Sequence, residues 1–193
     1  MKTTFLLHGG KLKLKDERND SYFRELAKNL SDGDQVLFVG FARRGQDDRI
    51  EVYEREKQLF LKQAEANVEF VNATYDNFME QVRAAKVIHI TGGQSPELLK
   101  DIQKYPDFID AIKGKVVGGS SAGACLFSTY YFYDDDSGVL EGLGTLPIRL
   151  RVHSDNPAYG KIEESISLLN KYPNELELVL IEECAWITKQ VDL

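Results

Sequence analysis

The residues Gly119-Ser120-Ser121-Ala122-Gly123 have the types and the spacing of a nucleophile elbow. In that motif a strand turns sharply into a helix and carries a serine at the turn, where the helix N-terminus favours negative charge on an oxygen. The apolar pair Val116-Val117 precedes the motif, and Ala124 continues the run of small residues after it. The predicted chemistry is attack by the Ser121 hydroxyl on a carbonyl carbon.

A serine hydroxyl needs a base to take its proton, and the chain has three histidines. His153 follows the predicted strand 148–152 and begins a loop downstream of the serine, so we predict that it is the base. His89 is flanked by isoleucines, which favours a structural role inside a strand. His8 ends a strand before two glycines, and it is the weaker candidate for the base.

Several residues are candidates for the carboxylate that orients the base. The cluster Asp134-Asp135-Asp136 lies between the serine and the histidine, which gives the chain order serine, aspartate, histidine. Three adjacent aspartates are also typical of a solvated turn. Glu141, a carboxylate on a predicted strand, competes with them.

An oxyanion hole requires two backbone donors beside the nucleophile. One is expected at Ala122, which follows the serine, and the second at Gly92-Gly93, because glycine lets the backbone approach a ligand closely. Gln94-Ser95-Pro96 then opens a helix, with Ser95 as its cap and Pro96 in its first turn. A structural turn is the alternative interpretation of the two glycines.

These segments must be positioned by the elements around them. Continuous apolar runs predict strands at 4–7, 35–39, 68–71, 87–90 and 115–117, and amphipathic stretches predict helices at 22–30, 50–66, 75–84 and 96–103. This alternation indicates a parallel, doubly wound α/β sheet, in which ligands bind beyond the carboxyl ends of the strands. Later segments predict strands at 139–143 and 148–152, a helix at 160–170, and two strands at 177–181 and 185–188, the last two antiparallel at a sheet edge.

Composition limits the class of protein. With 193 residues, 42% apolar and 28% charged, the chain fits one α/β domain spanning residues 1–193, without a membrane segment. The net charge of −7 argues against nucleic-acid or anionic-membrane partners. Cys125 and Cys184 form no disulfide framework or metal motif, so we expect a cytoplasmic protein with no metal and no cofactor, as a monomer or homodimer.

Together these segments resemble the peptidase E family of aspartyl dipeptidases, which are serine peptidases related to cyanophycinases. The resemblance covers most of the chain and rests on six places: His8-Gly9-Gly10, Phe38–Ala42, Ile88–Leu99, Gly119–Ala124, His153 and Glu183–Thr188. It implies a three-layer α/β/α fold with a mostly parallel central sheet, of the class I glutamine-amidotransferase-like (flavodoxin-like) type. It also implies Ser121 as nucleophile, His153 as base, Gly93 and Ala122 as oxyanion donors, and a carboxylate nearest Asp136.

The substrate-binding residues depart from the family pattern. Where the family often has asparagine in the turn before the helix, this chain has Gln94. The arginine that grips the carboxylate of an N-terminal aspartate has no clear counterpart. Lys161 falls near its place, and Arg149 or Arg151 could reach the site. The preferred substrate side chain is therefore left open.

The sequence thus predicts a serine peptidase that hydrolyses short peptides through an acyl-enzyme. The first alternative is an esterase or amidase that uses the same triad. The second is a catalytically silent protein that retains the pocket and binds a small ligand. The distance between Ser121 and His153 separates that second alternative from the enzymes, because a base beyond hydrogen-bonding reach cannot activate the serine.

Overall fold

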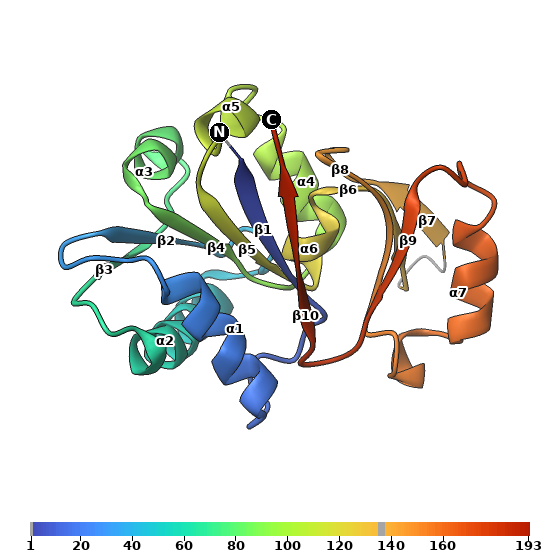
Figure 1. Cartoon of the computed structure of the whole chain (residues 1–193), viewed down its shortest axis with the longest axis horizontal. Coiled ribbons are helices and arrows are strands. Elements are labelled where there is room, and N and C mark those ends of the chain that lie inside the picture. Colours follow the sequence, from blue (N-terminus) through green and yellow to red (C-terminus); the bar gives the residue numbers. More distant parts are fainter. Residues whose placement is uncertain (1, 135–137) are drawn as a thin grey trace.

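Short apolar and β-branched runs form the strands of a mainly parallel six-stranded sheet (Figure 1). The structure, a computed structural model, describes residues 2–134 and 138–193. The strand order is β10-β1-β5-β4-β2-β3, and only β10 runs antiparallel to its neighbour. The bounds are β1 (Thr3–His8), β2 (Gln35–Val39), β3 (Glu69–Asn72), β4 (Val87–Ile90), β5 (Val116–Ser120) and β10 (Trp186–Val191).

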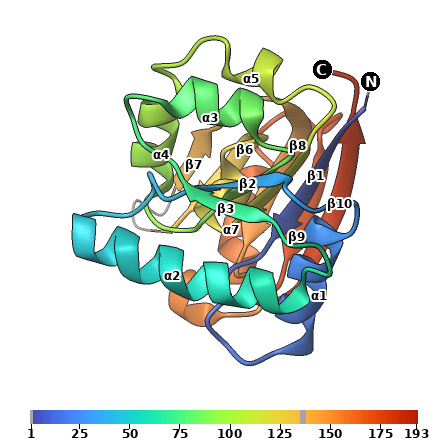
Figure 2. The same cartoon turned by 90° about the vertical axis from the view of Figure 1, so that its left-hand side faces the viewer.

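Helices cover both faces of this sheet, as Figure 2 shows. One face packs against α1 (Glu17–Ala27) and α2 (Gln46–Gln63), and the other against α3 (Phe78–Ala84), α4 (Ser95–Ile102) and α5 (Phe108–Ala111). Successive side chains of β1 show why: Leu6 enters the core with α1 and α2, whereas Phe5 and Leu7 enter the opposite core. The predicted three-layer fold with a mostly parallel central sheet is confirmed.

A second sheet, which the sequence analysis did not predict, stands beside the first (Figure 1). Its strand order is β7-β6-β8-β9, and α7 (Ile162–Leu169) packs on it. The bounds are β6 (Ser128–Tyr133), β7 (Gly138–Glu141), β8 (Leu146–Val152) and β9 (Glu177–Ile181). Of the two late strands expected at an antiparallel edge, β10 lies there, but β9 pairs parallel with β8.

The carboxyl ends of β1, β4 and β5 lie side by side and carry the glycine-rich loops. His8 pairs with Ser120, and Ile90 pairs with Gly119, so the three strands end at one edge of the sheet. The short helix α6 (Ala122–Cys125) follows β5 there. In a doubly wound sheet this edge is where ligands bind. Among the described residues, none of the helices has the length and apolar character that crossing a membrane requires.

Candidate active site

Ser121 lies in a strained turn between β5 and α6. Its backbone has φ 50° and ψ −106°, a region that residues other than glycine rarely adopt, and its N–H donates to His8 O over 2.9 Å. Glycine is required on both sides of the turn. A Cβ on Gly119 would collide with the backbone of Gly123, and one on Gly123 would collide with Ile90 O. The predicted strand–turn–helix context of the motif is therefore present.

His153 directly follows β8 in a left-handed conformation, with φ 52°, and faces the serine. Its Nε2 lies 3.0 Å from Ser121 Oγ. The imidazole stacks on the Tyr159 ring, with 4.0 Å between centroids, and packs against Gly10, where a Cβ would collide with it. The ring therefore has little freedom to turn away from the hydroxyl.

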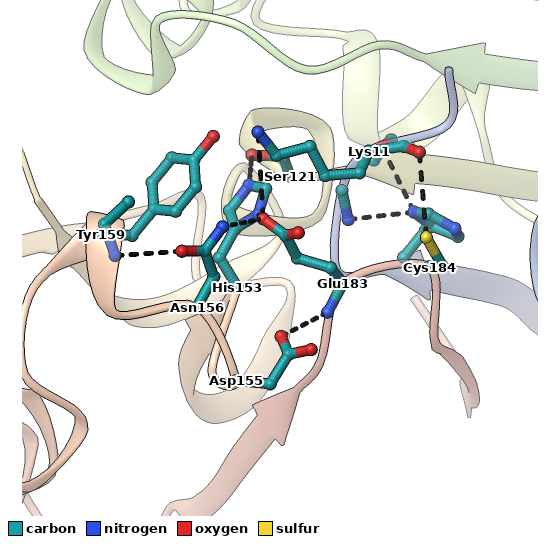
Figure 3. A network of polar contacts seen from close by, with 12 residues as sticks. Lys11, Ser121, His153, Asp155, Asn156, Tyr159, Glu183 and Cys184 are labelled. Atoms are coloured by element: carbon teal, nitrogen blue, oxygen red, sulfur yellow. Dashed lines mark hydrogen bonds and ion pairs between the residues drawn. The ribbon is translucent and has the colours of Figure 1, made fainter. Parts of the chain in front are cut away.

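Glu183 holds the other side of the imidazole (Figure 3). Its Oε1 lies 2.9 Å from His153 Nδ1 and also accepts a hydrogen bond of 2.8 Å from Asn156 Nδ2. The Glu183 N–H donates to Asp155 Oδ1 over 2.8 Å, which fixes the segment between β9 and β10. A carboxylate that accepts from Nδ1–H leaves the Nε2 lone pair directed at the serine O–H.

The surroundings keep His153 in its neutral form at neutral pH. Burial lowers the pKa of the imidazole below its ordinary value of 6.5, and the hydrogen bond to Glu183 opposes that shift in part. Lys11, whose Nζ lies 4.0 Å from Glu183 Oε1, lowers the pKa further. A neutral imidazole beside a hydroxyl can act as a general base.

Some backbone N–H groups beside the serine, two of them in the predicted oxyanion hole, have no acceptor within the described part of the chain. These two belong to Gly93 and Ala122, the two predicted oxyanion donors. A Cβ on the adjacent Gly92 would lie 3.1 Å from Ser121 Cβ, so this loop packs directly against the nucleophile. Gly93 is exposed and lines both cavities beside the serine.

Two cavities meet at the serine and the histidine. The larger, of about 380 Å³, extends from Gly93 toward Lys11 and Arg43. The smaller, of about 140 Å³, extends toward Gln94 and Arg151. A site with polar groups converging on two connected hollows fits a small, polar substrate.

Two of the three predicted substrate-binding residues line the smaller cavity, and the third lies outside both cavities. Gln94 lines the smaller cavity and accepts from Tyr133 Oη over 2.7 Å. Arg151 also lines it, stacks over the Phe132 ring at 4.4 Å, and donates to the Tyr159 and Gly160 carbonyls. Lys161 is exposed and lines neither cavity.

The acid candidates from the sequence have different positions. Asp135 and Asp136 lie outside the described residues. Asp134 lines the smaller cavity, and Glu141 is exposed on β7. Glu183 was not predicted as the acid, because the chain order serine, acid, histidine places the acid between residues 121 and 153. Its position inside the Glu183–Thr188 motif was the available signal.

The other two histidines are buried, and both make hydrogen bonds with a structural role. His8 Nε2 lies 2.8 Å from Asn19 Oδ1, while its Nδ1 accepts from Gly10 N–H. His89 Nε2 lies 2.9 Å from Glu56 Oε2, which agrees with the structural role expected for this residue. Across residues 2–134 and 138–193, no group of three or more histidine, cysteine, aspartate or glutamate side chains is placed to hold a metal ion.

Comparisons with known proteins identify a family and two similar folds. Residues 4–192 match the sequence profile of Peptidase family S51. A peptidase from an acI-B1 Actinobacterium has a similar solved structure, with a TM-score of 0.70 and 21% identity, over 98% of this chain and 84% of that one. A candidate Peptidase E protein from Listeria monocytogenes EGD-e is similar with a TM-score of 0.66 and 16% identity, over 99% and 100% of the two chains. Comparison with curated proteins finds no match.

Proposed function

The chain belongs to peptidase family S51, and we propose that it hydrolyses short peptides through a triad of Ser121, His153 and Glu183. The observation that carries the proposal is the continuous path of hydrogen bonds, 3.0 Å from Ser121 Oγ to His153 Nε2 and 2.9 Å from His153 Nδ1 to Glu183 Oε1. These are the contacts a serine nucleophile and its oriented base require.

In the first half of the reaction, His153 Nε2 takes the proton of Ser121 as the Oγ attacks the scissile carbonyl carbon. The carbonyl oxygen becomes an oxyanion, and the N–H groups of Gly93 and Ala122 donate to it. Glu183 stabilises the imidazolium that forms. His153 then gives its proton to the leaving nitrogen, and the carbon–nitrogen bond breaks to leave an acyl-enzyme.

In the second half, water takes the place of the departed amine. His153 Nε2 removes a proton from the water, and the hydroxide oxygen attacks the ester carbon of the acyl-enzyme. The same donors hold the second oxyanion, and the proton on His153 returns to Ser121 Oγ as the acid is released. No step requires a metal or an organic cofactor.

A dipeptidase of the peptidase E type is the activity we propose within the family. The smaller cavity, of about 140 Å³, has room for one side chain. The similarity to the Listeria protein described as a candidate Peptidase E supports the same activity. One domain spanning residues 1–193, a cytoplasmic location and a monomeric or homodimeric state remain predictions.

The alternatives differ in what they require of the same residues. An esterase or amidase would use the triad unchanged and differ only in the leaving group. A silent binding protein would not need the serine within reach of the histidine, and the 3.0 Å between Ser121 Oγ and His153 Nε2 supports an enzyme instead.

A substrate screen tests the proposal. Wild type and Ser121→Ala are incubated with dipeptides that have a free N-terminus and with p-nitrophenyl esters, and amine or nitrophenol release is measured. We expect wild type to hydrolyse dipeptides and Ser121→Ala to hydrolyse none. Turnover of the esters alone identifies an esterase. Equal turnover by both proteins contradicts the role of Ser121.

A further inference from the structure

The larger cavity beside Ser121 is rich in cationic side chains. Four of them line it: Lys11, Lys13, Arg43 and Arg55. Three acidic side chains also line it, namely Asp48, Glu51 and the buried Glu56. Since the chain as a whole has a net charge of −7, this gathering of cations next to the nucleophile runs against its overall charge.

Arg43 stands next to the loop that carries the oxyanion donor. The preceding residue, Ala42, accepts a hydrogen bond of 2.8 Å from Gln94 N–H, and its carbonyl is where a Cβ on Gly93 would collide. Within the described residues, the Arg43 guanidinium has one ion pair, to Asp48 at 3.8 Å. Its Nε is inaccessible to solvent and has no hydrogen-bond partner there.

Arg55 reaches the same cavity from α2. Its neighbour Glu56 accepts from Thr91 Oγ1 over 2.9 Å, so this wall is also tied to the loop of Gly92 and Gly93. One Arg55 nitrogen donates to Glu56 Oε1 over 3.1 Å. In the described part of the chain, Arg55 Nε is likewise buried without a partner.

Two arginines with unsatisfied N–H groups in one cavity are suited to a carboxylate. A guanidinium has further N–H groups beside Nε, and it pairs with a carboxylate through charged hydrogen bonds. Glu56 pairs with only one Arg55 nitrogen, and its two oxygens also bond His89 and Thr91. A ligand carboxylate in the cavity would give both arginines, which line it, a further partner.

We propose that the larger cavity binds the free α-carboxylate of the leaving residue through Arg43 and Arg55. The inference rests on the proposed peptidase function and deepens it. Ser121, Gly93 and both arginines line this one cavity, and we place the carboxylate on the residue directly after the scissile bond. The enzyme then selects dipeptides, and longer peptides or amidated ends lose this contact.

The test compares X-Ala dipeptides with the same dipeptides ending in alaninamide. Kinetics are measured for wild type, Arg43→Gln and the control Arg83→Gln, which makes the same change at an exposed position on α3. Wild type should prefer the free acid by about tenfold or more, the value of one charged hydrogen bond. Arg43→Gln should raise KM for the free acids by a similar factor, leave the amides unchanged, and be partly rescued by Arg43→Lys.

Several outcomes overturn the inference. Equal turnover of acids and amides by wild type removes the carboxylate contact while leaving the peptidase function intact. A loss in Arg43→Gln that depends on an acidic first side chain assigns Arg43 to the acyl side instead. If wild type cleaves neither series, the proposed function fails and the inference fails with it. Arg55→Gln, measured on the same pairs, should repeat the selective loss.

Discussion

Replacing Glu183 by glutamine tests the acid of the triad, because glutamine has nearly the same size and shape but no charge. The glutamine side chain would keep an amide oxygen that can accept from His153 Nδ1–H and from Asn156 Nδ2, as Glu183 Oε1 does now at 2.9 and 2.8 Å. The change therefore removes the negative charge and leaves the hydrogen bonds possible. The imidazolium formed during attack on the substrate loses its counter-ion.

The magnitude follows from the charge lost. A hydrogen bond to a charged group contributes about 1.5–3 kcal/mol, and each 1.36 kcal/mol is a factor of ten, so kcat/KM should fall by about tenfold to 150-fold. The carboxylate also raises the pKa of His153 against the effect of burial. Without it that pKa is lower. Since only neutral His153 accepts the proton, the acid limb of kcat/KM moves to lower pH.

The assay is the pH profile of kcat/KM on the best dipeptide, with Glu182→Gln as the matched control. Glu182 is the preceding residue, and its side chain is 61% exposed and lies 3.6 Å from Arg18. The control should follow the wild-type profile. A Glu183→Gln enzyme with an unchanged rate and an unchanged acid limb would refute the reasoning and direct attention to the aspartates at 134–136.

Two further predictions concern pH. Lys11→Met removes a charge that lowers the pKa of His153, so the acid limb of kcat/KM should move to higher pH, opposite to Glu183→Gln; a shift to lower pH contradicts the assigned electrostatics. Burial lowers the pKa of His8 from 6.5 to about 4. As the pH falls, His8 is protonated in the unfolded chain before it is protonated in the folded one. The free energy of unfolding should therefore decrease by roughly 3 kcal/mol between pH 6.5 and pH 4. Urea denaturation should show a smaller loss in His8→Gln, whose amide can bond Asn19 and Gly10 without titrating; equal losses contradict this.

The central sheet could be predicted because its strands carry their own signal. The runs 35–39 and 87–90 are continuous and apolar, and they form β2 and β4 with those bounds. The glycines at 119 and 123 likewise predict the turn at Ser121, because close backbone contacts at both positions leave no space for a Cβ. Local sequence is sufficient for such features.

The second sheet and the acid could not be predicted in the same way. The aromatic run 130–133 in β6 has neither helical spacing nor alternation, and its parallel partner β8 is chosen by tertiary packing. Glu183 is brought to His153 by the crossing from β9, in one sheet, to β10, in the other. The position of Glu183 therefore depends on how the two sheets lie relative to each other. The order of residues along the chain carries no information on that arrangement.

Covalent labelling tests the central claim most directly. Wild type, Ser121→Ala and His153→Ala are treated with a fluorophosphonate probe, and the adduct is located by peptide mapping with mass spectrometry. The account predicts one adduct on Ser121, none in Ser121→Ala, and slow labelling in His153→Ala, whose serine lacks its base. An adduct on the adjacent Ser120, or labelling that persists in Ser121→Ala, would contradict it.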